Sequence, residues 1–163
     1  MLSFASHSVS NRRNSVRCNR VKRREPGGGR LGEMVVRLIR ANQLYQGVPY
    51  AYAATTEATS LIFTAGACPL DDSGQVVAPG DIAVQARQAL ANLRVALAEC
   101  GCGLSDVLKT TVYVASDERA DLVAAWNEVA SAFGEHDAPS TLLGVAVLGY
   151  QDQLVEIEAV AAR

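Results

Sequence analysis

The C-terminal segment of the chain alternates strictly between apolar and acidic side chains. Val155, Ile157 and Ala159 are separated by Glu156 and Glu158. Successive side chains of a β-strand point to opposite faces of a sheet, whereas a helix gathers apolar residues at spacings of three and four. The segment therefore predicts a strand over residues 153–162 that buries one face and carries both carboxylates on the other.

Two interpretations of these carboxylates remain open at this point. A carboxylate in a cleft can manage protons or orient a water molecule, and its pKa is then often perturbed. A pair of acidic residues on a strand can equally face solvent or an oligomer interface. For Glu156 the residues alone do not decide between the two, and for Glu158 the second interpretation is favoured.

Two segments show the spacing of amphipathic helices. The first begins at Asp81 and ends at Gly101, where a left-handed cap is expected. The second begins at about Glu118 and ends at Gly134. The apolar stripe of the first comprises Ile82, Ala86, Ala89, Leu90, Leu93 and Leu97, and that of the second comprises Leu122, Val123, Trp126, Val129, Ala130 and Phe133.

The remaining apolar and β-branched runs predict strands, at 35–41, 50–54, 61–65, 108–114 and 140–147. The order β-β-β-α-β-α-β-β predicts an α+β domain, with a mixed sheet and both helices packed on one face. The other face would carry Thr64, Thr111, Tyr113 and Val160. If that face were in contact with solvent, a large apolar patch would be exposed. We therefore expect association with identical chains to cover it.

Residues 1–33 differ in composition from the rest of the chain. They carry eight basic and two acidic side chains, a net charge of +6, while residues 34–163 carry seven and fifteen, a net charge of −8. The segment is consistent with a nucleic-acid-binding arm, with an organelle transit peptide, or with a disordered extension that precedes a working start at Met34. The third interpretation is favoured, which leaves 34–163 as the folded domain.

Several classes of partner are disfavoured by the same composition. An acidic domain does not neutralise phosphates, so nucleic acid is not expected as the main partner. No apolar run is long enough to span a bilayer, and no secretory leader is visible, which favours a reducing cytoplasm. Cys100 and Cys102 have only His136 as a further histidine in the domain, so no metal site is expected.

Several motifs in this order resemble one known family. They are Val48-Pro49-Tyr50, the segment from Phe63-Thr64-Ala65-Gly66 to Pro69-Leu70-Asp71, the helix pattern 85–93, the strand Asp106-Val107-Leu108-Lys109-Thr110-Thr111-Val112-Tyr113-Val114, Trp126-Asn127, the turn Ala138-Pro139-Ser140-Thr141 and the closing Val155-Glu156-Ile157-Glu158-Ala159. Together they resemble the RidA (YjgF-type) family over residues 36–163.

That resemblance implies a chorismate-mutase-like fold and a homotrimer that binds a small molecule in clefts between subunits. Deaminase members of the family hydrolyse reactive 2-imino and 2-enamino acids to 2-keto acids and ammonia, without a cofactor. Carried over residue by residue, Glu156 would orient the water, Tyr50 and Asn127 would line the cleft, and Gly66 and Ser140 would contact the ligand.

One departure bears directly on activity. The family's turn usually carries an arginine that holds the substrate carboxylate, and aligned on the turn Ser140 takes its place. A hydroxyl does not offer the charged bidentate contact of a guanidinium. A second reading is therefore kept, in which the chain is a non-deaminating binding or chaperone-like member. Arg37, Arg87 and Lys109 are the cations considered as replacements.

The same residues also have ordinary structural interpretations. Tyr50 alone would be a packed aromatic, Asn127 a solvated side chain and Ser140 a turn residue. Cys68 reads either as a reactive thiol or, preferably, as a small buried residue at the end of a strand. A hydrolytic set of His136 with Ser140 or Asp137 is disfavoured, because proximity in sequence supplies neither a base within reach nor an oxyanion site.

Overall fold

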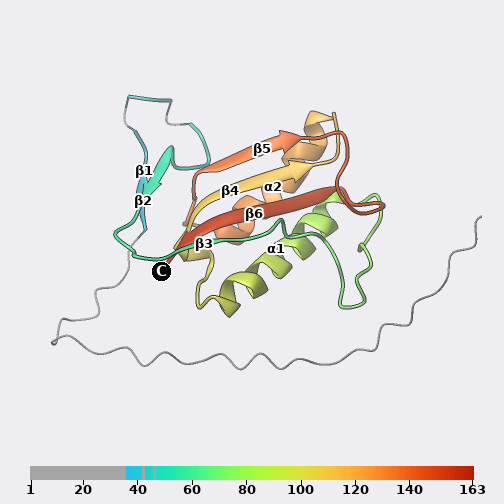
Figure 1. Cartoon of the computed structure of the whole chain (residues 1–163). Helices are drawn as coiled ribbons and strands as arrows, with labels where there is room; N and C mark the ends of the chain where they lie inside the picture. Colours follow the sequence, from blue (N-terminus) through green and yellow to red (C-terminus); the bar gives the residue numbers. More distant parts are fainter. Residues whose placement is uncertain (1–35, 42, 46) are drawn as a thin grey trace, which may run out of the picture. The chain divides into compact units, whose positions relative to one another are not determined.

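The computed structural model describes residues 36–41, 43–45 and 47–163. The predicted basic extension 1–33 and the predicted start at Met34 lie outside these described residues. The elements follow one another as β1, β2, β3, α1, β4, α2, β5 and β6, with a 3₁₀ turn at Leu104–Asp106 before β4 (Figure 1). This is the predicted order, and the fold class is α+β as expected.

A four-stranded sheet forms the centre of the domain. Its order is β3 (Leu61–Phe63), β6 (Val155–Ala162), β4 (Val107–Val114) and β5 (Ser140–Gly144). β4 and β5 are parallel, and the other pairs are antiparallel, so the sheet is mixed as predicted. The closing strand β6 therefore lies inside the sheet, with a hydrogen-bonded neighbour at each edge.

A separate two-stranded sheet precedes the main one. β1 (Arg37–Ile39) pairs antiparallel with β2 (Ala53–Thr55), with Leu38 opposite Ala54. Both strands are shorter than predicted. Tyr50 thus lies in the segment that enters β2, and not within the strand.

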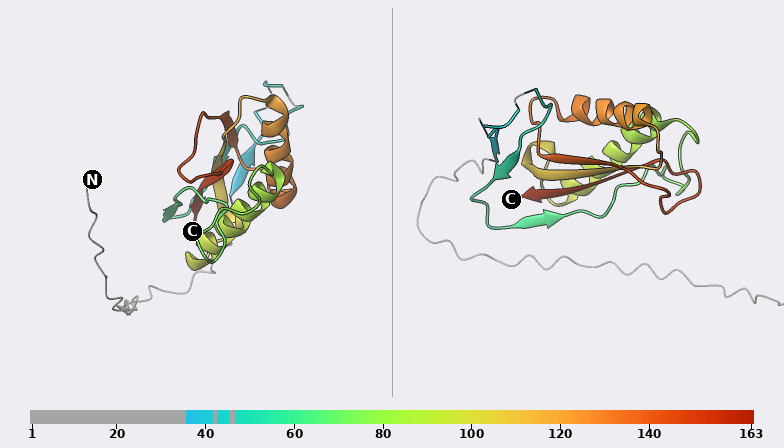
Figure 2. Two further views of the ribbon diagram at one scale, coloured as in Figure 1. Left: turned by 90° about the vertical axis from the view of Figure 1, so that its right-hand side faces the viewer. Right: turned by 90° about the horizontal axis from the view of Figure 1, so that it is seen from above.

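Both helices cover one face of the four-stranded sheet (Figure 2). α1 (Ile82–Glu99) begins where Asp81 Oδ1 accepts a hydrogen bond from the Val84 amide at 2.9 Å, and the chain leaves it through Gly101 at φ +71°. Positive φ suits glycine because it has no Cβ. The predicted stripe of α1 is buried apart from the half-buried Ile82, and Gln85 is buried among it with no exposed surface.

The second helix differs from the prediction at one residue. α2 (Arg119–Phe133) ends as expected at Gly134, at φ +58°, but Val123 keeps 49% of its surface exposed. Ala125 and Val129 are the residues of α2 that are fully buried. The helix therefore turns the row through Ala125 towards the sheet, which leaves Val123 at the outer side, beside the end of β5. The prediction that Val123 is buried is wrong.

The two faces of the sheet are chemically distinct. Val112, Val155 and Ile157 lie on the face that the helices cover, and all three are fully buried. On the other face, here called the open face, Tyr113 lies opposite Glu156 and Thr111 opposite Glu158. Phe63, paired with Val160, keeps 72% of its surface exposed there. Across the described residues, no helix combines the length and the apolar content that crossing a bilayer requires.

Candidate functional site

Glu156 stands on the open face of β6 and is held from one side. Its Oε2 accepts a hydrogen bond from Gln153 Nε2 at 3.0 Å and a weaker one from Cys68 Sγ at 3.4 Å. The carboxyl group lies over Gly66. A Cβ built at Gly66 would lie 2.5 Å from Glu156 Cδ and would overlap Oε1. Only a residue without a side chain leaves room for this carboxylate.

The segment that carries Gly66 and Cys68 is fixed between the sheet and α1. Ala67 exchanges both backbone hydrogen bonds with Ile157, at 2.8 and 3.1 Å, next to Glu156 on β6. From α1, the Asn92 side-chain amide donates to the carbonyl oxygens of Cys68, at 2.8 Å, and of Leu70, at 2.9 Å. These contacts explain how residues 90 positions apart in the chain meet.

The thiol of Cys68 is a hydrogen-bond donor at neutral pH. Burial, together with the charge of Glu156 and the hydrogen bond to it, raises the pKa of Cys68 to about 11. Because the thiolate is the nucleophilic form of cysteine, a thiol with this pKa is poorly reactive near neutrality. The structure favours the interpretation of Cys68 as a structural residue, although it is half-buried and not fully enclosed.

Tyr50 and Ser140 lie away from Glu156 and line a hollow of about 440 Å³. Trp126 and Tyr50 form its aromatic wall, with their rings edge to face at 6.4 Å. Ser140 Oγ accepts a hydrogen bond from Thr110 Oγ1 at 2.7 Å. The described residues that line this hollow, here called the aromatic pocket, are uncharged, and they are Pro49, Tyr50, Trp126, Ser140, Thr141 and Leu142.

The predicted site residues therefore fall into two groups within one chain. Glu156 and Gly66 meet on the open face, whereas Ser140 pairs with Thr110, whose side chain points to the helix-covered face. Tyr50 joins Ser140 in the aromatic pocket. Asn127 is exposed on α2 and is not among the residues that line that pocket. One subunit alone does not bring Glu156 to Ser140.

None of the cations considered as replacements lines the aromatic pocket. Arg87 pairs with Glu128 at 2.6 Å, between the two helices, and Arg37 lies in β1. Lys109 donates to Thr141 Oγ1 and to the Thr110 carbonyl, and burial lowers its pKa while Glu158 opposes that shift.

A cation that was not considered, Arg40, contacts the backbone of one residue of the aromatic pocket. Arg40 donates to the Tyr50 carbonyl oxygen at 2.9 Å and pairs with Asp137. Sequence reasoning missed this contact, because it joins residues far apart in the chain and neither motif nor spacing marks it. The charge of Arg40 is directed to Asp137, and Arg40 is not one of the residues that line the pocket.

Other candidates from the sequence do not assemble into sites. His136 Nε2 lies 2.8 Å from the Val107 carbonyl oxygen, and its ring stacks on Phe133, so it does not serve Ser140 as a base. Glu158 accepts a hydrogen bond from the Tyr113 hydroxyl at 3.0 Å. Over the described part of the chain, no cluster of histidine, cysteine and acidic side chains could hold a metal ion.

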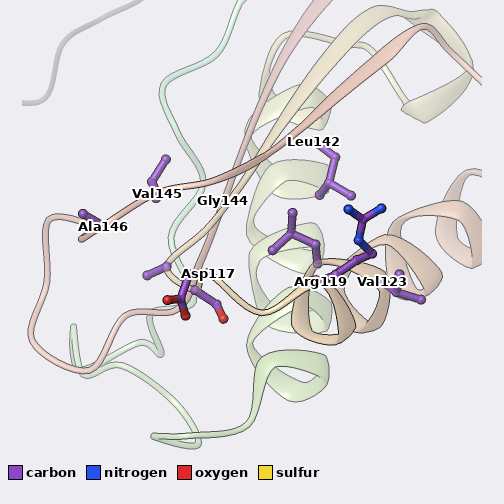
Figure 3. A pocket seen from close by; sticks show the side chains of 10 residues that line it. Asp117, Arg119, Val123, Leu142, Gly144, Val145 and Ala146 are labelled. Carbon is purple, nitrogen blue, oxygen red and sulfur yellow. The ribbon is translucent and has the colours of Figure 1, made fainter.

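A further hollow, of about 1170 Å³, lies between the start of α2 and the end of β5 (Figure 3). Asp117, Arg119 and Val123 line it from the start of α2, and Leu142, Val145 and Ala146 line it from β5 and the segment that follows. Gly144 lets two segments approach closely there, because a Cβ would lie 2.6 Å from the Ser116 carbonyl oxygen. None of the residues predicted for the site lines this hollow.

Comparison with known proteins gives a consistent result. Residues 42–163 match the family model described as Endoribonuclease L-PSP. A RutC family protein of Synechocystis sp. is 37% identical over 131 residues, which cover 78% of this chain and 97% of that protein. The 2-iminobutanoate/2-iminopropanoate deaminase of Escherichia coli K12 is 34% identical over 116 residues, 69% of this chain and 87% of that enzyme.

Solved structures show the same fold. The Rid-family protein YyfB of Yersinia pestis, described as a protein of unknown function, superimposes with a TM-score of 0.75 at 28% identity. The alignment covers 80% of this chain and all of that one. The two helices and the mixed sheet are thus arranged as in that structure.

Proposed function

Because the chain belongs to the RidA/YjgF family, also named for endoribonuclease L-PSP and RutC, we propose that it hydrolyses reactive imines or enamines to carbonyl compounds and ammonia. The observation that carries this proposal is the Glu156 carboxylate. It lies on the open face over Gly66, fixed at one oxygen by hydrogen bonds. The deaminase activity of the E. coli relative supports the same reaction.

In the proposed reaction, Glu156 orients a water molecule towards the imine carbon. As the C–O bond forms, one water proton passes to Glu156, which delivers it to the imine nitrogen, so that a carbinolamine with an amino group results. In the collapse, the hydroxyl proton passes through Glu156 to the amino nitrogen, the C–N bond breaks, ammonia leaves, and the hydroxyl oxygen becomes the carbonyl oxygen. The reaction consumes one water molecule, changes no oxidation state overall and requires no cofactor.

The placement of the two groups supports an oligomeric site. Glu156 is on the open face and the aromatic pocket lies at the edge formed by β5. In the proposed homotrimer, the open face of one subunit would pack against the β5 edge of the next. Phe63 and Leu61, 72% and 54% exposed in a single subunit, would then be covered. Glu156 would complete the pocket of Tyr50 and Ser140 from a neighbouring chain.

One observation favours a second candidate function. The described residues that line the aromatic pocket carry hydroxyl and aromatic groups and no charge. An arginine at this turn would bind a carboxylate through two charge-assisted hydrogen bonds. With Ser140 at this position, the pocket fits an uncharged ligand better than a 2-imino acid. The alternative is therefore a member that binds a small neutral molecule and does not deaminate amino-acid imines.

An imine-trapping assay on the full chain separates the two functions. An amino-acid oxidase generates imines from a panel of amino acids, and semicarbazide captures whatever imine remains free. The deaminase proposal predicts faster release of keto acid and less trapped imine with the wild-type protein, and the loss of both effects in Glu156→Gln. A glutamine keeps the size of the side chain and removes its charge.

The Ser140→Arg variant provides the second arm of this experiment. Activity that appears only in Ser140→Arg, from an inactive parent, supports the binding-protein alternative with an otherwise competent site. Activity in the wild type that Ser140→Arg does not improve indicates that another group anchors the substrate. A wild type and a Ser140→Arg variant that are both inactive across the panel contradict the deaminase proposal.

A further inference from the structure

The groups that hold Glu156 were not assigned any role by the motifs of the family. We propose that Gln153 and Cys68 are positioning residues, which fix Oε2 of Glu156 so that Oε1 alone is presented to the reacting water. This inference rests on the proposed function for its chemistry, whereas the contacts themselves are independent of that function. It extends the site from one carboxylate to a set of four residues, completed by Gly66.

Gln153 is a rigid donor, because both ends of its amide are occupied. The side chain is 4% exposed, its Oε1 accepts from the Tyr150 amide at 3.0 Å, and its Nε2 donates to Glu156 and to the Val155 carbonyl oxygen. Asp152, just before it, adopts φ +63°, an uncommon conformation for a residue with a side chain. The hydrogen bond between the Tyr150 amide and Gln153 Oε1 thus holds the loop that precedes β6.

Cys68 supplies the second donor from a different part of the chain. Its backbone is anchored by Asn92, and its Sγ lies 3.4 Å from the same oxygen of Glu156 that Gln153 reaches. Two donors that converge on one oxygen restrict rotation of the carboxyl group. The other oxygen lies over Gly66, where the missing side chain leaves space. Oε1 is therefore the atom suited to accept the water proton.

The neighbouring ionisable groups do not compete for this role. Tyr113 lies opposite Glu156 on β4, but its hydroxyl donates to Glu158. Glu158 follows two residues later on the same face of β6, beside Thr111. After burial, the charge of Glu156 is the next largest cause of the raised pKa of Cys68, so this thiol provides a measurement of the contact that does not depend on catalysis.

The first test measures the pKa of Cys68 in the full-length protein. Alkylation by iodoacetamide is followed against pH, with the modified residue identified by mass spectrometry of peptides. In Glu156→Gln the pKa of Cys68 is expected to fall below its wild-type value of about 11, because the neighbouring negative charge is gone. Cys100 is exposed and is the internal control, with an unchanged profile. An unchanged pKa of Cys68 in Glu156→Gln would overturn the contact.

The second test asks whether the contact matters to the reaction. Cys68→Ala and Gln153→Leu are each expected to lower kcat about 10-fold or more, with KM within about twofold, because a misplaced carboxylate weakens orientation rather than binding. Cys68→Ser restores a donor and should recover part of kcat. Cys100→Ser is the matched control.

The two tests separate this inference from the proposed function. A protein without deaminase activity whose Cys68 pKa falls in Glu156→Gln rules out the reaction and supports the contact with Glu156. An active protein in which Cys68→Ala and Gln153→Leu keep the wild-type kcat overturns the positioning role.

Discussion

Replacing Gly66 by alanine should disable the site while leaving the fold almost intact. The new methyl carbon would lie 2.5 Å from Glu156 Cδ. Non-bonded carbon atoms normally stay about 3.5 to 4.0 Å apart, so the carboxyl group must retreat by roughly 1 Å. A misplacement of that size in a catalytic group reduces the rate by roughly 100-fold, or about 2.7 kcal/mol in activation free energy.

The free energy of unfolding should change much less. Displacing the carboxylate weakens the hydrogen bonds from Gln153 and Cys68, each worth on the order of 1 kcal/mol. Gly66 is not among the described glycines with positive φ, so alanine adds no backbone strain and restricts the unfolded chain by about 0.4 to 1 kcal/mol in the opposite direction. We expect a net loss of stability near 1 kcal/mol in urea denaturation followed by circular dichroism.

Gly103→Ala is the matched control for this substitution. A Cβ at Gly103 would have its nearest atoms at 4.0 Å, and its φ of −127° suits any residue. In the imine-trapping assay, Gly103→Ala should behave as the wild type. If Gly66→Ala retains the kcat of Gly103→Ala, the position assigned to the Glu156 carboxylate is not the one used in catalysis.

Three further predictions test the packing, the assembly and the open face. The Gln85 side chain donates to the Asp152 carbonyl oxygen at 2.9 Å and accepts from the Leu154 amide at 2.7 Å. Gln85→Leu leaves both backbone groups unsatisfied, so chemical denaturation should show a free energy of unfolding that is lower by about 2 to 4 kcal/mol. Phe63→Glu places a charge on the open face, and light scattering should then show a monomer in place of the proposed trimer. Val95→Glu, at a position 63% exposed on α1, should leave the trimer unchanged. The hydrogen bond to Glu158 raises the pKa of Tyr113, so Glu158→Gln should lower that pKa in an NMR titration of labelled tyrosines, and an unchanged value would refute the contact.

The order of helices and strands could be predicted because each type of element has its own spacing of apolar residues along the sequence. Alternation around Glu156 marks a strand, and the stripe from Ala86 to Leu97 marks a helix. Capping also has a local signal, which is why Asp81 and Gly134 were placed correctly. The prediction that Val123 is buried is wrong because apolar spacing alone does not specify which side of α2 packs against the sheet.

The site was less accessible to sequence reasoning, because its contacts are long-range. Glu156 and Gly66 were suggested by resemblance, but the residues that fix Glu156 depend on the pairing of Ala67 with Ile157. Arg40 reaches Asp137 only through the placement of the β1–β2 sheet. The separation of Glu156 from Ser140 by the sheet follows from the register of β4 with β5 and β6, which no local pattern specifies.

The central claim is that the site joins Glu156 of one subunit to the aromatic pocket of another, and subunit mixing tests it most directly. Glu156→Gln removes the carboxylate, and Tyr50→Ala removes a wall of the pocket, so each variant alone should show little imine hydrolysis. If the two are unfolded together in equal amounts and refolded at random, each of the three sites in a trimer is intact with a chance of about one quarter. The account predicts recovery of about one quarter of the wild-type activity. Mixed trimers, verified by native mass spectrometry, that stay as inactive as their parents would contradict it.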